Sequence, residues 1–137
     1  MNLKLGPLFR DKFFGAPYKL GGQSKEEGFD CASFVDNYYK ELGNEFPDLS
    51  DLYSIIHAGK SEKARELLWR RLFKVTESIP LGYVQPGDLV VFEVEDFGDY
   101  PGIYLGNGIV GACFTDRGVT TVKYDSLNVI QVRRWKD

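Results

Sequence analysis

The architecture of this chain is built around residues 29–42, which read Phe29-Asp30-Cys31-Ala32-Ser33-Phe34-Val35-Asp36-Asn37-Tyr38-Tyr39-Lys40-Glu41-Leu42. Apolar side chains recur in this segment at helical spacing and predict an amphipathic helix with one buried stripe, made of Cys31, Phe34, Val35, Tyr38 and Leu42. Asp30 stands at the N-cap position, and Gly43 stands where a left-handed C-terminal stop belongs. Cys31 therefore lies in the first helical turn, where we expect the local dipole to favour its thiolate. The alternative for Cys31 is a small buried core residue.

Length and composition indicate one globular domain over residues 1–137. Of the 137 residues, 43% are apolar and 27% are charged, with a net charge of −3. This mildly acidic balance argues against a nucleic-acid partner, and no apolar run approaches the roughly 20 residues of a membrane span. Two cysteines do not make a disulfide scaffold for a chain of this size. The N-terminus lacks the apolar centre of a signal peptide, so we expect synthesis in the cytoplasm without a secretion signal.

Periodicity divides the chain into a helical part, 7–80, and a sheet part, 84–135. The helical part contains a short helix at 7–14, the Cys31 helix, and two helices that Ser50 and Ser61 can cap, at 51–58 and 62–74. The sheet part contains extended segments at 88–94, 103–105, 109–114, 119–124 and 129–135. The sequence Asn107-Gly108 predicts a tight hairpin between two of these segments. Helices followed by antiparallel strands indicate an α+β class with segregated layers. On the helix at 62–74 we expect a solvated face, with a binding patch as the alternative, at Arg65, Arg70 and Arg71.

Three motifs in this order carry a resemblance to a known family. They are the loop Gly15-Ala16-Pro17-Tyr18-Lys19-Leu20-Gly21-Gly22, the segment Gly28-Phe29-Asp30-Cys31-Ala32-Ser33-Phe34-Val35, and the pair Gln85-Pro86-Gly87-Asp88-Leu89-Val90-Val91-Phe92 with Gly102-Ile103-Tyr104-Leu105-Gly106-Asn107-Gly108. Together they resemble the NlpC-type cysteine peptidases, small papain-like enzymes that cut the peptide stems of bacterial cell wall. The resemblance extends over roughly residues 8–115. It implies the NlpC-type fold, with N-terminal helices packed on an antiparallel sheet of about five strands.

The resemblance also implies which residues surround the reaction. Cys31 occupies the position of the nucleophile, and Tyr18, Asp30 and Ser33 occupy positions expected to bind substrate. In such enzymes a histidine at the head of the hairpin strand takes the thiol proton, and a polar residue on the next strand orients that histidine. A packed structural tyrosine is the alternative for Tyr18. The resemblance implies neither a metal ion nor a cofactor.

Both partners of the nucleophile are replaced in this chain. Tyr100 stands at the position of the family's histidine, and Gly111 stands at the orienting position. A phenol with an ordinary pKa near 10 is a poor general base at neutral pH. The chain's one histidine, His57, lies near the end of the helix at 51–58 and is a less favoured alternative base. Cys113 could approach Cys31, although a buried free thiol is the simpler interpretation.

These observations lead to two hypotheses from different functional classes. In the first, the chain is a catalytically degenerate NlpC-type domain with a structural or binding role, a bacteriophage tail component near peptidoglycan. Its partners would then be peptidoglycan peptides or other tail proteins, and it would leave the cytoplasm as part of a virion. In the alternative, it is an active cysteine peptidase or amidase acting on stem peptides, with Cys31 served by an unorthodox base. That base would be His57 or a group from a partner chain.

Overall fold

A computed structural model of the protein describes residues 5–44, 46–95 and 97–136. Within these ranges the helices are α1 (Leu5–Lys12), α2 (Cys31–Glu41), α3 (Ser50–His57) and α4 (Ser61–Val75). The strands are β1 (Thr76–Ile79), β2 (Leu89–Val94), β3 (Gly98–Gly106), β4 (Ile109–Phe114), β5 (Gly118–Lys123) and β6 (Asn128–Trp135). The order of helices first and strands afterwards confirms the predicted α+β class. The predicted boundary near residue 80 is less sharp, because β1 already follows α4 directly.

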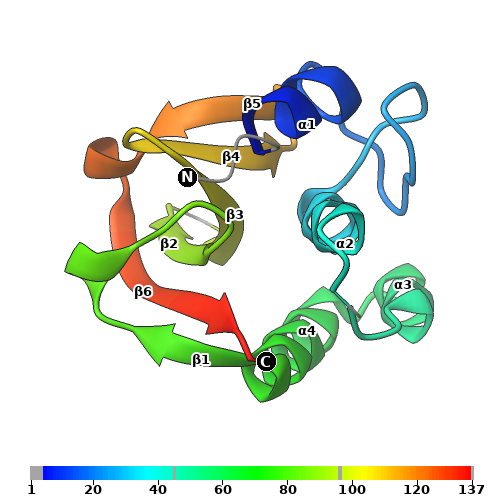
Figure 1. The fold of residues 1–137 in the computed structure, drawn as a ribbon. Helices are drawn as coiled ribbons and strands as arrows, with labels where there is room; N and C mark the ends of the chain where they lie inside the picture. Colours follow the sequence, from blue (N-terminus) through cyan, green and yellow to red (C-terminus); the bar gives the residue numbers. More distant parts are fainter. Residues whose placement is uncertain (1–4, 45, 96, 137) are drawn as a thin grey trace.

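The strands form one antiparallel sheet in the order β1-β6-β2-β3-β4-β5, which curls strongly while the helices gather on one side of it (Figure 1). The sequence predicted about five strands, and the described residues contain six. The additional strand is β1, whose Thr76 pairs with Trp135 of β6 and whose Ile79 pairs with Val132. Four residues are too few for a readable alternation of polar and apolar side chains, so this edge strand could not be predicted.

Helix α2 packs against β3 and β4 and joins the two layers. Its predicted apolar stripe is buried, with Phe34 and Tyr38 fully enclosed against Leu89 and Ile103 of the sheet. Burial of one such side chain contributes about 1.5–3 kcal/mol, so this interface is a large part of the stability. The opposite face of the curled sheet carries a second apolar cluster, made of Val90, Phe92, Tyr100, Val110, Ala112 and Phe114.

The predicted ends of α2 are confirmed, whereas the predicted caps of the next two helices are wrong. Asp30 caps α2 from an extended conformation, and Gly43 beyond its end has φ +86°. Ser50 and Ser61 are instead the first residues inside α3 and α4, and neither helix has a side-chain cap. The Ser50 N–H donates to Asp48 Oδ1 at 2.9 Å, so an aspartate two residues before the expected cap fixes the turn into α3.

The outer edge of β5 is met by the chain segment that follows α1. The Gly15 N–H donates to the Val119 carbonyl at 3.1 Å, and the Val119 N–H donates to the Ala16 carbonyl at 2.9 Å. Gly118 has φ +73°, and a Cβ atom at this residue would lie 2.2 Å from the Ala16 carbonyl oxygen. A side chain therefore cannot be placed there without separating the two segments.

A buried carboxylate joins two neighbouring strands at the start of β2. Asp88 is 2% exposed, and both of its oxygens accept hydrogen bonds from the Arg134 guanidinium of β6 at 2.8 Å. The Gln85 N–H donates to the same carboxylate at 2.8 Å. This charge-assisted, two-pronged contact fixes the turn that opens β2 and the position of β6 beside it.

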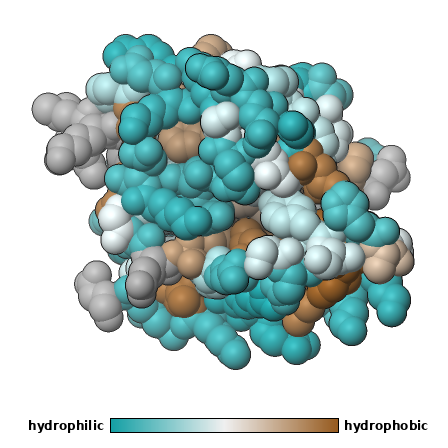
Figure 2. Space-filling model, turned by 90° about the vertical axis from the view of Figure 1, so that its right-hand side faces the viewer, coloured by the Kyte–Doolittle hydropathy of each residue, from teal (hydrophilic) through white to brown (hydrophobic). Residues whose placement is uncertain are grey.

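The face of the molecule seen in Figure 2 is mostly hydrophilic, with apolar side chains visible only in separate patches. Among the described residues, no helix is both long and apolar enough to cross a bilayer.

Candidate active-site pocket

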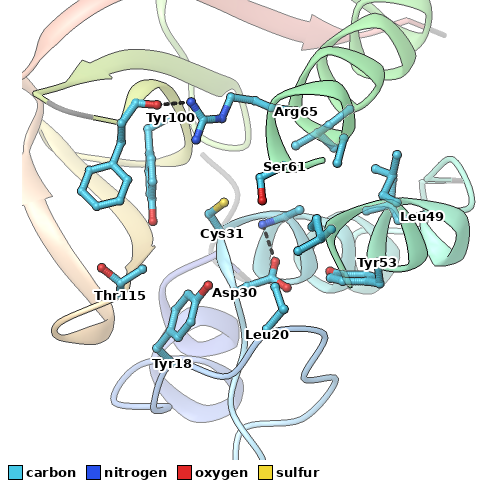
Figure 3. A pocket seen from close by; sticks show the side chains of 16 residues that line it. Tyr18, Leu20, Asp30, Cys31, Leu49, Tyr53, Ser61, Arg65, Tyr100 and Thr115 are labelled. Atoms are coloured by element: carbon cyan, nitrogen blue, oxygen red, sulfur yellow. Dashed lines mark hydrogen bonds between the residues drawn. The ribbon is translucent and has the colours of Figure 1, made fainter. Parts of the chain in front are cut away.

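A pocket of about 320 Å³ opens beside the N-terminus of α2, bounded by α3, α4 and the start of β3 (Figure 3). It contains Cys31 together with Tyr18, Asp30 and Tyr100, four of the residues that the sequence singled out. Its lining consists of Tyr18, Leu20, Asp30, Cys31, Ala32, Leu49, Leu52, Tyr53, Ile56, Ser61, Ala64, Arg65, Leu68, Phe97, Tyr100 and Thr115.

Asp30 fixes the position of Cys31 by capping α2. Asp30 Oδ1 accepts hydrogen bonds from the N–H groups of Ala32 and Ser33 at 2.8 Å each. Ser33 completes a capping box, because its Oγ accepts a hydrogen bond from the Asp30 N–H at 2.9 Å. The second oxygen, Oδ2, accepts from the Gly21 N–H at 2.7 Å and thereby anchors the preceding loop. The carboxylate is 3% exposed and receives three backbone N–H groups.

The paired glycines before the helix permit a close backbone approach. A Cβ atom on Gly22 would lie 2.1 Å from the carbonyl oxygen of Gly28, so a larger residue would push the loop away from the segment that leads into α2. Tyr18 pairs with Phe29 across the same approach, which brings its side chain to the pocket. The loop and the helix start therefore form one unit around Cys31.

The thiol of Cys31 is not activated in this arrangement. Burial raises the pKa of Cys31 to about 12, and the negative charge of Asp30 adds to the rise. The Ala32 N–H and the Arg65 guanidinium lower this pKa, but by less than burial raises it. The expectation of a favoured thiolate is therefore wrong, since Asp30 already accepts the N–H groups of the first turn and brings its own charge. At neutral pH the Cys31 side chain is a neutral thiol.

Tyr100 occupies the predicted position of the base and lies beside Cys31 (Figure 3). It is 8% exposed, its ring stacks on Phe114 with centroids 5.5 Å apart, and its hydroxyl donates to the Cys113 carbonyl at 2.8 Å. Burial raises the pKa of Tyr100 above its ordinary value. A phenol that stays protonated and already donates its proton to a carbonyl cannot take the proton of Cys31 at neutral pH.

Gly111, which stands at the orienting position, lies on the face of the sheet opposite to Tyr100. Gly111 of β4 pairs with Ile103 of β3, and a Cβ atom on Gly111 would lie 2.6 Å from Cε1 of Phe9 in α1. Tyr100 packs in the cluster on the opposite face of the sheet. The structure therefore does not bring these two positions together, and Phe9 fills the space beside Gly111.

The remaining predicted residues divide between the pocket and its surroundings. Tyr18 lines the pocket, and burial, followed by the charge of Asp30, raises its pKa to about 12. Ser33 is buried in the capping box and does not line the pocket. His57 is the exposed last residue of α3 and does not line it either. Cys113 is fully buried, and its thiol donates to the Phe29 carbonyl at 3.0 Å.

Sequence reasoning missed the wall that α3 and α4 contribute. Arg65 lines the pocket, and its guanidinium donates to the Phe97 carbonyl in the turn between β2 and β3. Tyr53 of α3 also lines the pocket, and its hydroxyl is buried without a hydrogen-bond partner among the described residues. The one available signal was that Arg65 borders the apolar stripe of its helix, next to Ala64. Among the described residues, no three side chains suited to binding a metal ion come together.

Comparison with known proteins agrees with this geometry. The model of the NlpC/P60 family matches residues 15–133. This chain belongs to the NlpC/P60 family.

Two curated relatives illustrate the range of this family. A gamma-DL-glutamyl hydrolase from Bacillus subtilis (strain 168) is 33% identical over 123 residues, which are 88% of this chain and 23% of that protein. The murein DD-endopeptidase MepS/murein LD-carboxypeptidase of Escherichia coli (strain K12) is 32% identical over 106 residues, 77% of this chain and 46% of that protein. The chain thus spans less than half the length of these relatives.

Solved structures share the fold of this NlpC/P60 domain. An NlpC/P60 family protein from Bacillus cereus aligns with a TM-score of 0.66 at 22% identity, covering 96% of this chain and 39% of the other. NlpC2 from Trichomonas vaginalis aligns with a TM-score of 0.68 at 19% identity, covering 98% and 46%. The papain-like NlpC-type fold expected from the three motifs is confirmed.

Proposed function

We propose that this NlpC/P60 domain binds peptidoglycan stem peptides without hydrolysing them. The observation that carries the proposal is the environment of the Cys31 thiol: the described residues that line its pocket include no histidine, and the one carboxylate, Asp30, is already engaged by three backbone N–H groups. Because burial raises the pKa of Cys31 well above neutral, the neutral thiol is the dominant form at pH 7. Loss of a catalytic base from such a unit reduces the rate by several orders of magnitude.

The nature of the ligand rests on the relatives. The curated relative from Escherichia coli is by name a murein endopeptidase, and the one from Bacillus subtilis is a glutamyl hydrolase. A pocket lined by Tyr18 and Tyr100 offers aromatic surface and neutral hydroxyls to a peptide. Binding without cleavage would keep the recognition of the family and lose its chemistry.

We further propose that the domain acts as a component of a bacteriophage tail and leaves the cytoplasm with the virion. This setting rests on analogy at the level of the fold. Genes for tail proteins next to the gene for this chain would support it, and a purified virion analysed by mass spectrometry would test it. Tail particles that lack the chain would contradict it.

Incubation of the purified chain with stem peptides tests the absence of hydrolysis. We expect no new product by mass spectrometry, while chemical shifts of residues around Cys31 change on titration of the same peptide. Cys31→Ser is the matched control, because it keeps the size of the side chain and removes the nucleophile. Product release by the parent chain that disappears in Cys31→Ser would overturn the proposal.

An active thiol hydrolase is the second candidate, favoured by the partly exposed Cys31 in an open pocket and by the hydrolases among its relatives. It predicts rapid alkylation of Cys31 by iodoacetamide at pH 6, slowed in His57→Ala or dependent on a partner chain. Reaction no faster than that of a free thiol would exclude this candidate. Tyr100→His distinguishes the two further, since it restores an imidazole beside the sulfur and should produce slow hydrolysis only if the groove still admits the peptide.

A further inference from the structure

We propose that the pocket beside Cys31 also binds a small aliphatic carboxylate, with its chain between α3 and α4 and its carboxylate at Arg65. This ligand class goes beyond the peptide binding proposed above and does not depend on it.

The wall that α3 and α4 supply is aliphatic. Leu52 of α3 and Ala64 and Leu68 of α4 are 3%, 3% and 7% exposed, and Leu49 and Ile56 extend the same surface. These side chains offer dispersion contacts and no hydrogen-bonding groups. A hydrocarbon chain placed against them would gain from leaving water.

The apolar lining continues to the mouth of the pocket. Leu20 in the loop before α2 is 39% exposed, and Phe97 in the turn between β2 and β3 is 44% exposed. Both line the pocket that holds Cys31. Two large apolar side chains left in water at the entrance of an apolar cavity indicate that the ligand covers them. The volume of about 320 Å³ lies at the lower end of the roughly 300–1,000 Å³ of small-molecule sites.

At the rim, Arg65 is placed to receive an anionic end group, away from the buried carboxylate of Asp30. The charged residues in its lining are Asp30 and Arg65. Asp30 is 3% exposed and already accepts three backbone N–H groups, so it has little to offer an incoming amine. Arg65 is exposed, and its guanidinium lies at the rim with one N–H directed to the Phe97 carbonyl. A guanidinium has five donors, so this group can also receive a carboxylate.

The neutral polar groups agree with the same choice. In Figure 3 the hydroxyls of Tyr18 and Ser61 point toward the side of the pocket that holds the Cys31 sulfur, and Thr115 lines the same pocket. Hydroxyls donate hydrogen bonds readily to a carboxylate or carbonyl oxygen. The site therefore combines an aliphatic floor, a cation at the rim and neutral donors between them. That arrangement complements a short fatty acid and opposes an alkylamine.

Calorimetric titration of the purified chain with octanoate, butyrate and octylamine tests this assignment. We expect octanoate to bind at least about tenfold more tightly than butyrate, because four methylene groups fewer leave the aliphatic wall exposed. Octylamine should bind more weakly than octanoate for want of an anion at Arg65. Equal affinity for the acid and the amine, or for the long and the short acid, would overturn the proposal, as would absence of octanoate binding.

Variants of α4 locate the ligand. Arg65→Gln should weaken octanoate binding about tenfold, which corresponds to the loss of one charge-assisted hydrogen bond. Arg65→Lys keeps the positive charge and should retain most of the affinity. The matched control is Arg70→Gln, which removes an exposed arginine of the same helix that does not line the pocket. Equal losses in Arg65→Gln and Arg70→Gln would contradict the site.

Ala64→Phe provides a second, independent variant because it fills the cavity from its floor. Circular dichroism first establishes that the variant is folded, and its octanoate affinity should then fall by more than tenfold. Octanoate binding that survives this substitution would place the ligand elsewhere. Hydrolysis of stem peptides bears on the proposed function alone, and these titrations bear on the ligand of the pocket alone, so the two proposals fail separately.

Discussion

At the scale of single residues, the chemistry of Cys31 is set first by burial and then by its neighbour Asp30, both of which raise the pKa of the thiol. The carboxylate takes the N–H groups that a thiolate at this helix terminus would use, and its charge opposes a second anion. A reactive cysteine in this position therefore requires a nearby cation or imidazole to offset Asp30. In this pocket the Arg65 guanidinium lowers the pKa of Cys31, but by less than burial and the Asp30 charge raise it.

Asp30→Asn should make Cys31 more reactive. Asparagine is as good an N-cap as aspartate, so the variant can still accept the N–H groups of Ala32 and Ser33 while it removes the charge; the Gly21 N–H, which Oδ2 accepts, loses its acceptor. We expect several-fold faster alkylation of Cys31 by iodoacetamide at pH 8, measured by mass spectrometry. The measurement uses a Cys113→Ala background, so that Cys31 is the thiol that reacts. In the parent background the rate should still rise with pH beyond 10, because the pKa of Cys31 lies at about 12. A rate that levels off near pH 8.5 would contradict this account.

Residue types at motif positions were the part of the site most open to prediction. Asp30, Cys31, Tyr18 and Tyr100 were all identified from local sequence, and all four line the pocket. Arg65 was expected on a solvated face, with a binding patch as the alternative, because an arginine on an amphipathic helix resembles a solvated side chain until the turn it contacts is known. The raised pKa of Cys31 was equally hidden, since it depends on burial by elements far away in the sequence.

At the scale of elements, α1 packs against the sheet at Gly111 of β4. Gly111→Ala should lower the free energy of unfolding by about 1–3 kcal/mol, because the added methyl group would lie 2.6 Å from the buried ring of Phe9. Urea unfolding measures the change. The matched control is Gly82→Ala, where a Cβ atom meets nothing within 4 Å. Substituting Phe9 by leucine in the Gly111→Ala background should restore part of the loss; a loss that stays unchanged would place the strain elsewhere.

The contact between β2 and β6 gives a second prediction at this scale. Asp88→Asn should cost about 2 kcal/mol of stability, since it leaves the Arg134 guanidinium without its two-pronged partner beside a buried position. The comparison is Asp11→Asn, which removes the ion-pair partner of Arg10. The side chain of Arg10 is 71% exposed and that of Asp11 is 66% exposed. That pair should contribute nothing measurable. Similar losses in both variants would contradict the importance of burial.

Long periodic elements were predictable and short ones were not. The β3–β4 hairpin follows from the Asn107-Gly108 turn, and Asn107 does adopt a positive φ of 55°. The edge strand β1 has no pattern of its own and forms because β6 is available beside it. The position of Gly111 could be read from the sequence, but the face on which it lies depends on the register of β4 against β3.

At the scale of the whole molecule, buried thiols make the free energy of unfolding depend on pH in the alkaline range. Burial raises the pKa of both Cys31 and Cys113 from 9.0 to about 12. Below pH 9 both thiols are protonated in the folded and the unfolded state, so they contribute no pH dependence. Between about pH 9 and 12 the unfolded chain loses these protons first, and the folded state is progressively disfavoured.

The free energy of unfolding should therefore be steady up to about pH 8.5 and then fall by about 1–3 kcal/mol per pH unit. Urea titrations at pH 7 to 11 measure it. The double variant Cys31→Ala, Cys113→Ala should be less stable at pH 7 but should decline less steeply, with the buried tyrosines responsible for what remains. Parallel declines in both proteins would contradict the role of the thiols.

The hydrogen bonds that join Gly15 and Ala16 to Val119 have a consequence for solubility. They occupy the main-chain groups of β5 that would otherwise be open to another molecule's strand, and the exposed charge of Lys123 guards the far end of the same edge. A chain shortened past residue 16 would lose this pairing together with Phe9 and Phe13, which are buried in the core against α2. Such a fragment should stick to itself edge to edge, so the first helix and its trailing loop serve as a built-in barrier against fibre formation.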